Sequence, residues 1–423
     1  MSDSIKSKAL RFICSSSMVF INFLTTLYIA RTIGFNEKLD VYYLTLAIYL
    51  YLMTVIGWAL SNVLTPLFIK YNNDIALSKI LCIVSIWIFP VCVMLFSIKG
   101  YIISIVFQNY EFSIVSSEFN TFFSIAISIF FFDVIAMIFV SYENSISRFN
   151  IPIVCNFISS LFGLVSSYAL VNDFGILGAL ISQFVIKISI VIILSLINLN
   201  KLNFVVYDRL IAAEILNKIK YFILSGIYFR TDDLLEKYIA SFLVAGQLSL
   251  VSFVQRIYGA IITIVNTVII TPTLTKFCNH KTDVESYDLI KRLLILALVL
   301  GGVGFGFVHF FGVYTVRSIF PSQLNTVDTY VYKALMITYP TSVILVINQL
   351  LHNYLLSRSQ EKNIAQFDVI SFTISAVLKI ILTIELGFIG FLWGILFSSL
   401  LKLIFKMVLF VNIIKNRCSV SVE

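Results

Sequence analysis

Long apolar segments follow one another along this chain and constrain its fold more than any other feature. They run to roughly 20 residues or more, which is the length that an α-helix needs to cross a bilayer. Transmembrane barrel strands are only about 10 residues long and alternate strictly, so these segments indicate helices. Only 12% of the 423 residues are charged, against about 25% in a soluble domain. That deficit excludes two or three soluble domains and a disordered chain, and the 6 Cys are too sparse for a disulfide scaffold.

The apolar segments predict an all-α, polytopic membrane protein. At about 20 residues and a short loop for each span, about 12 spans fit this length. Two further apolar stretches, 100–110 and 315–325, are too short to span and are expected at the membrane interface. The expected helices cover residues 9–32, 41–68, 79–98, 118–141, 151–172, 175–197, 219–244, 246–271, 289–314, 331–356, 365–386 and 388–412.

The Lys and Arg residues between these helices are distributed unequally between the two sides of the membrane. If the N-terminus is cytoplasmic, the outer segments hold Arg31, Lys38, Lys99, Arg317 and Lys333. Cytoplasmic segments are richer in Lys and Arg, so the count predicts that both termini are cytoplasmic. The net charge of +8 is thus a topology signal, and no nucleic-acid partner is expected. The larger, inner set is Lys6, Lys8, Arg11, Lys70, Lys79, Arg148, Lys201, Arg209, Lys218, Lys220, Lys276, Lys281, Lys291, Arg292, Arg358, Lys362, Lys415 and Arg417.

Two short motifs recur in the second half of the chain, in the same order and at similar spacing. Segment 65–71 reads TPLFIKY and segment 271–277 reads TPTLTKF. Segment 175–179 reads GILGA and segment 387–391 reads GFIGF. Because six spans is an even number, the two halves share one orientation and form parallel repeats. We therefore expect a six-helix half at 1–205 and another at 206–423, with the substrate held between them in a central cavity.

Basic residues inside the expected helices are the first candidates for chemistry. A charge at the bilayer centre costs about 2.5–3.5 kcal/mol on insertion scales, so each needs a reason. The guanidinium of Arg256 is always charged and forks onto phosphate oxygens, which indicates an anion-binding role; a salt bridge that fixes helix packing is the alternative. Lys187, Lys379 and Lys402 add positive charge, although Lys402, together with Lys406, could instead reach the cytoplasmic interface.

The expected seventh helix holds the densest group of charges: Arg230, Asp232, Asp233, Glu236 and Lys237. Asp233 is three residues from Arg230 and four from Lys237, so these charges can neutralise each other on one helix face. Asp232 and Glu236 are also four residues apart but carry the same sign. Two carboxylates in a low dielectric share a proton or a cation, as a proton- or sodium-coupled antiporter requires. A structural network or a wet cavity wall is the alternative.

Three further acids lie in or beside expected helices. Asp133 follows three Phe residues and should face a partner or the cavity. Asp368 lies almost on the same helix face as Lys379, three turns away, so the two could pair. Asp40 begins the expected second helix, where an N-cap role accounts for it. The cysteines and histidines show no metal-binding spacing, so neither a metal site nor a cofactor is expected.

Several segments together resemble the multidrug/oligosaccharidyl-lipid/polysaccharide (MOP) exporter superfamily. Within it, the chain looks most like the polysaccharide transporters, the O-antigen flippases of the Wzx type, and more distantly like lipid II flippases. Lipid II flippases carry two further helices, and arginines at positions where this chain has Val19, Thr25 and Met53, so the O-antigen type is favoured. The resemblance rests on IARTIG at 29–34 with Asp40, on Gly57 with LSNVLTP at 60–66, on Asn144 with RFNIP at 148–152, on ASFLVAG at 240–246 and on QRIY at 255–258.

The resemblance implies a MATE-like fold and a flippase rather than an enzyme. Its substrate would be an undecaprenyl-diphosphate-linked oligosaccharide, moved from the cytoplasmic to the outer leaflet of a bacterial inner membrane. Alternating access would be driven by a proton or sodium gradient instead of ATP. By this resemblance, Arg256 matches an arginine of lipid II flippases, and an acid in the seventh helix matches the pattern of the polysaccharide transporters. The resemblance also implies a gating role for Asp40. Membrane lipids, a polysaccharide polymerase and a chain-length regulator are the implied partners.

Two other functions compete with this one. A drug or cation antiporter of the same superfamily would favour an acidic, cation-accepting cavity, and the excess of Lys and Arg inside the helices argues against it. A membrane enzyme, such as a polysaccharide polymerase or ligase, usually needs a large external loop with clustered catalytic groups. No outer segment between the expected helices is long enough for one.

Overall fold

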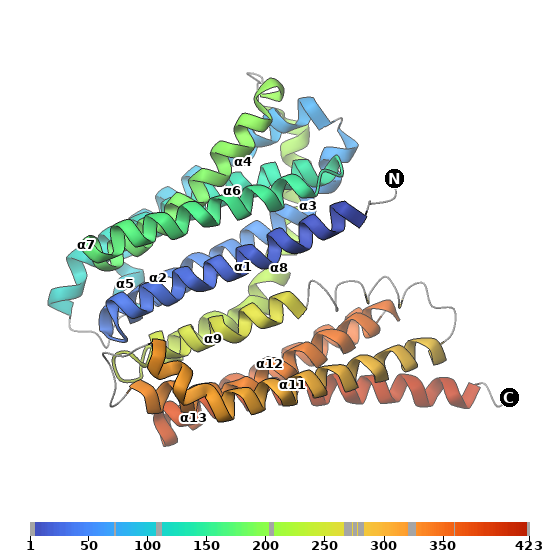
Figure 1. The fold of residues 1–423 in the computed structure, drawn as a ribbon. Helices are drawn as coiled ribbons and strands as arrows, with labels where there is room; N and C mark the ends of the chain where they lie inside the picture. The colour runs from blue at the N-terminus through green and yellow to red at the C-terminus, as the bar shows by residue number, and fades with distance from the viewer. Residues whose placement is uncertain are drawn as a thin grey trace. The chain divides into compact units, whose positions relative to one another are not determined.

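The computed structural model describes most of the chain, and helix is the only regular secondary structure in the described part (Figure 1). The prediction of an all-α chain is confirmed there. The described residues are 5–71, 73–106, 112–202, 207–265, 273, 277, 283–319, 327–358 and 360–420.

Most helices begin and end near the predicted positions, but α8 begins well before the expected span at 219–244. The first half of the chain contains α1 (Ile5–Ile33), α2 (Glu37–Leu52), a π-helical turn (Met53–Gly57), α3 (Trp58–Lys70), α4 (Asn73–Ser97), α5 (Lys99–Val106), α6 (Phe112–Ser145), α7 (Asn150–Ile197) and a 3₁₀ turn (Leu199–Lys201). The second half contains α8 (Arg209–Ala240), α9 (Gln247–Val265), α11 (Asp283–Ile319), α12 (Val327–Ser357) and α13 (Glu361–Val420).

Eight stretches among the described residues are long and apolar enough to cross a membrane, and the chain is a multi-pass membrane protein. Two of them, in α7 and α13, are 48 residues long, and each contains two of the expected spans. Helices α8 and α9, the expected seventh and eighth spans, are not among the eight. Helix α8 carries the charge cluster, and residues 266–271 of the expected eighth span lie outside the described residues. Helix α5 covers 100–106 of the short stretch at 100–110, and the rest of that stretch and most of 315–325 are not described.

A sharp bend in α7 and another in α13 reproduce the predicted repeat in the backbone. Gly175 has φ 54° and ψ −124°, and Gly387 has φ 58° and ψ −136°. Side chains other than glycine are strained at such angles, because their Cβ meets the backbone. Three residues after each bend, Gly178 and Gly390 leave no room for a Cβ beside the carbonyl oxygens of Leu170 and Leu382. The two helices therefore fold back in the same way at matching positions.

Contacts divide the chain into two compact units, Met1–Ser249 and Leu250–Glu423. In the first unit α1 packs along α7, and α6 packs against α2, α3, α4 and α7. In the second unit α12 packs between α11 and α13. The first unit extends beyond residue 205 because α8 contacts α2 and α3. Packing and sequence symmetry are different criteria, so the repeat boundary at 205 remains a prediction.

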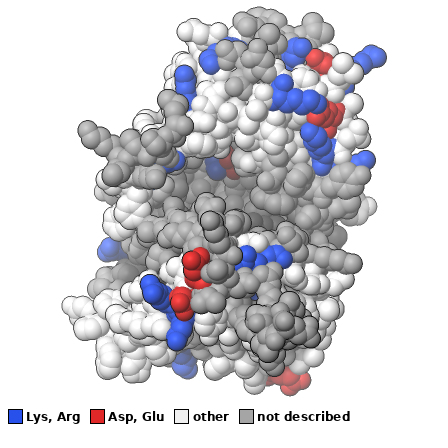
Figure 2. Space-filling model, turned by 90° about the vertical axis from the view of Figure 1, so that its right-hand side faces the viewer, with Lys and Arg blue, Asp and Glu red and all other residues white. Residues whose placement is uncertain are grey.

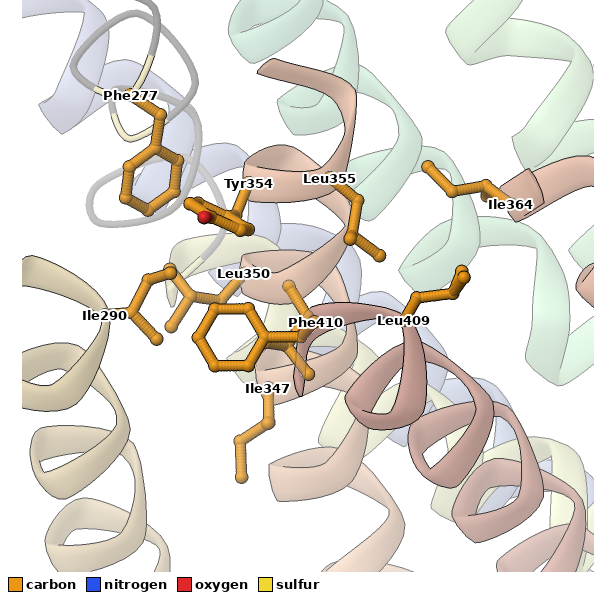
Figure 3. Close-up of a cluster of buried hydrophobic side chains, with 10 residues drawn as sticks. Phe277, Ile290, Ile347, Leu350, Tyr354, Leu355, Ile364, Leu409 and Phe410 are labelled. Carbon is orange, nitrogen blue, oxygen red and sulfur yellow. The ribbon is translucent and has the colours of Figure 1, made fainter. Parts of the chain in front are cut away.

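A cluster of aromatic and aliphatic side chains forms the core of the second unit (Figure 3). The Tyr354 ring on α12 meets the edges of Phe277 and Phe410, with ring centroids 5.7 and 5.1 Å apart. Edge-to-face contacts of this kind add to the energy of apolar burial. By contrast, none of the most apolar window of α11 is buried. That helix presents its apolar side chains outward, as expected of a helix in lipid.

Candidate functional site

Asp133 is the centre of a polar contact between three helices of the first unit. Its Oδ1 lies 2.8 Å from Nζ of Lys187 on α7. Its Oδ2 accepts a hydrogen bond from the hydroxyl of Tyr49 on α2. The side chains of Lys187 and Asp133 are only 23% and 12% exposed, so the charges compensate each other in a largely dry environment. This contact joins one predicted cation-site residue to one predicted coupling residue.

Asp40 is fully buried and binds the segment that leads from α8 into α9. The backbone N–H of Gly246 donates to its Oδ2 at 2.5 Å, and that of Ser249 donates to its Oδ1 at 2.6 Å. Gly246 has φ 89°, and a Cβ there would press on the carbonyl oxygen of Phe35. Asn36, whose side chain accepts from the N–H of Leu39, caps α2. Asp40 therefore stabilises the beginning of α9 and does not serve as the N-cap of its own helix.

The charge cluster of the expected seventh helix lies in the last turns of α8. Asp232 is buried, Asp233 is exposed, and Glu236 and Lys237 are half-buried. Each of these four side chains takes part in polar or electrostatic interactions. The side chain of Arg230 lies outside the described part of the structure. Because buried and exposed side chains occur together within two turns, one face of this part of α8 is turned toward the protein and the other away from it.

The other predicted cations are buried to different degrees. Arg256 is half-buried in the middle of α9. Lys379 of α13 is 0% exposed, and its stem packs against Gly394, on the far side of the bend in the same helix. Both side chains interact with other groups. A positive charge thus lies deep in the apolar part of each unit, with Lys187 in the first.

Asp368 belongs to a second group of charges, between α12 and α13. Its charge and that of Lys402 act on Lys406, and both Asp368 and Lys406 act on the ring of His352. Nδ1 of His352 is buried without a hydrogen-bond partner in the described part of the chain. The charge of Asp368 therefore opposes that of Lys406 in the last span.

Ion pairs connect the beginning of α8 to the end of α3 and the first turns of α4. Glu214 accepts from Nζ of Lys70 and of Lys218, both at 2.8 Å, and from the hydroxyl of Tyr71 at 2.5 Å. Asp208, the N-cap of α8, pairs with Lys79 at 2.8 Å. Figure 2 views the end of the molecule at which α1 begins, where blue and red side chains lie beside one another. Several basic residues that the sequence assigned to topology therefore also fasten the connection to α8.

These pairs change the acidity of the two carboxyl groups. Hydrogen bonds from Lys218, Lys70 and Tyr71 lower the pKa of Glu214 to about 2. The hydrogen bond from Lys79, with those of the helix N-terminus, lowers the pKa of Asp208 below its usual range. Both groups remain charged through the whole physiological range.

Sequence reasoning missed several partners of the acids. It did not connect Tyr49 with Asp133 or Ser249 with Asp40, and it gave no role to Glu214. Apart from the pair of Glu214 with Lys218, four residues away on the same helix, these contacts join residues distant in sequence, and nothing local in the sequence indicates them. The ASFLVAG segment at 240–246 was the one usable signal, because it ends on the glycine that Asp40 binds.

No protein-family model and no curated protein sequence matches this chain. Solved structures do match its fold. A structure described as the lipid II flippase MurJ in an inward closed conformation aligns with a TM-score of 0.79 and 16% identity, over 95% of this chain and 87% of that one. An inward-facing multidrug resistance MATE family transporter of the MOP superfamily aligns at 0.71 and 11%, over 94% and 95%. The eukaryotic MATE transporter AtDTX14 aligns at 0.63 and 16%, over 95% and 93%. The chain therefore has the fold of the MOP and MATE transporters.

Proposed function

We propose that this protein is a flippase for an undecaprenyl-diphosphate-linked oligosaccharide such as an O-antigen repeat unit. It would carry the polar head group from the cytoplasmic to the outer leaflet of a bacterial inner membrane, with both termini in the cytoplasm. The lipid tail would stay in the bilayer throughout. Parallel repeats of this kind support transport by alternating access.

The observation that carries the proposal is the positive charge buried within membrane-spanning helices. Lys379 is fully buried, and Arg256 and Lys402 are half-buried, whereas the charge of Lys187 is compensated by Asp133. Such charges are costly in a membrane and mark substrate or ion pathways. A diphosphate carries the opposite charge and accepts several charge-assisted hydrogen bonds. A polar, anionic head group is thus the cargo that these side chains suit best.

Coupling to an ion gradient is the second part of the proposal. Asp232 is buried in α8 and lies one turn from Glu236. A buried acid beside another acid favours binding of a proton or a cation. We assign proton or sodium binding to this pair, and compensation of the neighbouring Asp233 to Arg230 and Lys237.

Gating is assigned to Asp40. Its carboxylate binds the backbone of residues 246–249, where the chain passes from the first compact unit to the second. Breaking two short hydrogen bonds is a discrete change that a transport cycle can use. Release of Asp40 would free the beginning of α9.

The test is a deletion strain complemented with variants. The wild-type gene and Arg292→Ala, which removes an exposed arginine of α11, should restore surface polysaccharide. Arg256→Ala should insert at normal levels, judged by immunoblot of membranes, yet leave the surface bare and lipid-linked oligosaccharide accumulated. Normal surface polysaccharide in the deletion strain would refute the function, and in Arg256→Ala alone it would refute the role of Arg256.

A drug or cation antiporter is the alternative favoured by the MATE structures that share this fold. It predicts altered drug susceptibility on deletion and on overexpression, whereas a flippase predicts no change. A lipid II flippase would be essential for cell-wall synthesis, so viable deletion cells with intact walls would exclude it. Under the main proposal, a polysaccharide polymerase and a chain-length regulator receive the translocated product.

A further inference from the structure

A polar cup lies at one end of the first unit, where α1 ends and α2 begins (left in Figure 1). Its volume is about 540 Å³, which falls within the roughly 300–1,000 Å³ typical of small-ligand sites. The walls come from the end of α1, the beginnings of α2 and α6, and the bend of α7. The positive-inside count places this end on the outer side of the membrane.

The amide of Asn36 in the cup wall already bonds to the backbone of Ile33 and Leu39. The other polar side chains that line the cup are Thr32, Lys38, Thr121 and Asn172, and all four are exposed. None of them hydrogen-bonds to another group in the described part of the chain. Their hydroxyl, amide and ammonium groups are therefore available to a ligand. Phe174, which is 56% exposed, adds an aromatic ring to the same wall.

Comparison with the second bend of the internal repeat shows which side chains the first bend requires and which belong only to the cup. Gly175 and Gly387 bend their helices with nearly the same backbone angles. Around the second bend, Ile384 and Leu386 occupy the positions that correspond to Asn172 and Phe174. The fold thus accepts aliphatic side chains at these places, and the amide and the ring of the first bend are not required to make it.

We infer that this cup binds a saccharide unit of the transported glycan as it arrives on the outer side, an inference that rests on the proposed function. Threonine hydroxyls and an asparagine amide each donate and accept hydrogen bonds, which matches the dual character of sugar hydroxyls. The face of Phe174 offers an electron-rich surface for the C–H groups of a sugar ring. Among the described residues of the lining, Lys38 is the one that carries a charge, so the lining repels a metal ion, and its single ammonium group does not balance the charge of a diphosphate.

The test uses the full-length protein in lipid nanodiscs, because common detergents carry sugar head groups. Saturation-transfer NMR with free glucose, galactose, rhamnose and N-acetylglucosamine should show transfer to at least one sugar. In Asn172→Ala the dissociation constant for that sugar should rise about fivefold or more, as expected for the loss of one hydrogen bond. Ile384→Ala is the matched control at the second bend and should bind like the wild type.

Three results would overturn the inference: no transfer to any of the four sugars, unchanged binding in Asn172→Ala, or an equal loss in Ile384→Ala. Deletion of the gene tests the proposed function separately. If deletion abolishes export but the protein binds no sugar, only the proposed sugar site is refuted. If the protein binds sugar but the deletion strain has normal surface polysaccharide, only the flippase function is refuted.

Discussion

Replacement of Lys187 by methionine isolates the energy of the Asp133 contact. Methionine keeps the length and the apolar character of the lysine stem but removes its charge. Asp133 then keeps only the hydroxyl of Tyr49 as a hydrogen-bond partner among the described residues. The carboxylate is left in an environment that no longer compensates its charge.

The expected cost is about 3 kcal/mol in the free energy of unfolding. Removing one partner of a buried ion pair costs about 3–5 kcal/mol, because the other charge stays buried. The lower end applies here because Lys187 is 23% exposed and water screens part of the interaction. Asp133→Asn keeps an acceptor for Tyr49, so the double variant Asp133→Asn/Lys187→Met removes both charges and leaves the hydroxyl bonded.

Unfolding can be followed by circular dichroism in mixed micelles as the fraction of a denaturing detergent rises. The four proteins of the double-variant cycle should give a coupling energy of at least about 1 kcal/mol between the two positions. The double variant should be more stable than Lys187→Met alone. Additivity within about 0.5 kcal/mol would refute the claim that the pair is a compensated contact within the membrane.

Three further perturbations test other parts of the structure. Gly178→Ala should lower stability by about 1–3 kcal/mol through overpacking at the bend, whereas Gly100→Ala, which meets nothing within 4 Å, should not; equal melting temperatures would contradict the close approach. Because the pKa of Glu214 is lowered to about 2, its ion pairs stabilise the fold fully above about pH 4.5 and lose this effect as the pH falls toward 2. In Glu214→Gln the free energy of unfolding should therefore depend less on pH in that window. The same pH dependence in the wild type and in the variant would show that these pairs do not stabilise the fold. Asp40→Asn should speed hydrogen exchange of the amides at 246–249, and equal protection would show that the carboxylate does not hold them.

Much of the fold follows from hydropathy, because a lipid solvent forces backbone hydrogen bonds to be satisfied within helices. The expected spans at 151–172 and 175–197 fall on either side of Gly175, and their motif marked a real break in the helix. The sequence did not reveal that helical hydrogen bonding resumes directly after the bend. That continuity depends on Gly178, which lets the returning helix approach Leu170.

The candidate site was less predictable than the fold. Only the free-energy cost of placing a charge in a membrane helix singled out Lys187 and Asp133 in the sequence. The two residues were then assigned to separate functions, cation site and ion coupling. Their pairing depends on how α6 and α7 cross, which side-chain packing decides. In the same way Asp40 fits the description of a helix cap, and only the structure shows that the capped segment belongs to α9.

The most direct test of the central claim is translocation by the purified protein in liposomes. Lipid-linked oligosaccharide extracted from deletion cells would be reconstituted with the protein, and a glycan-cleaving enzyme would be added outside. With an imposed proton or sodium gradient, we expect the fraction of cleaved oligosaccharide to rise above that in protein-free liposomes, and Arg256→Ala to abolish the rise. Equal cleavage with and without the protein, under either gradient, would contradict the account.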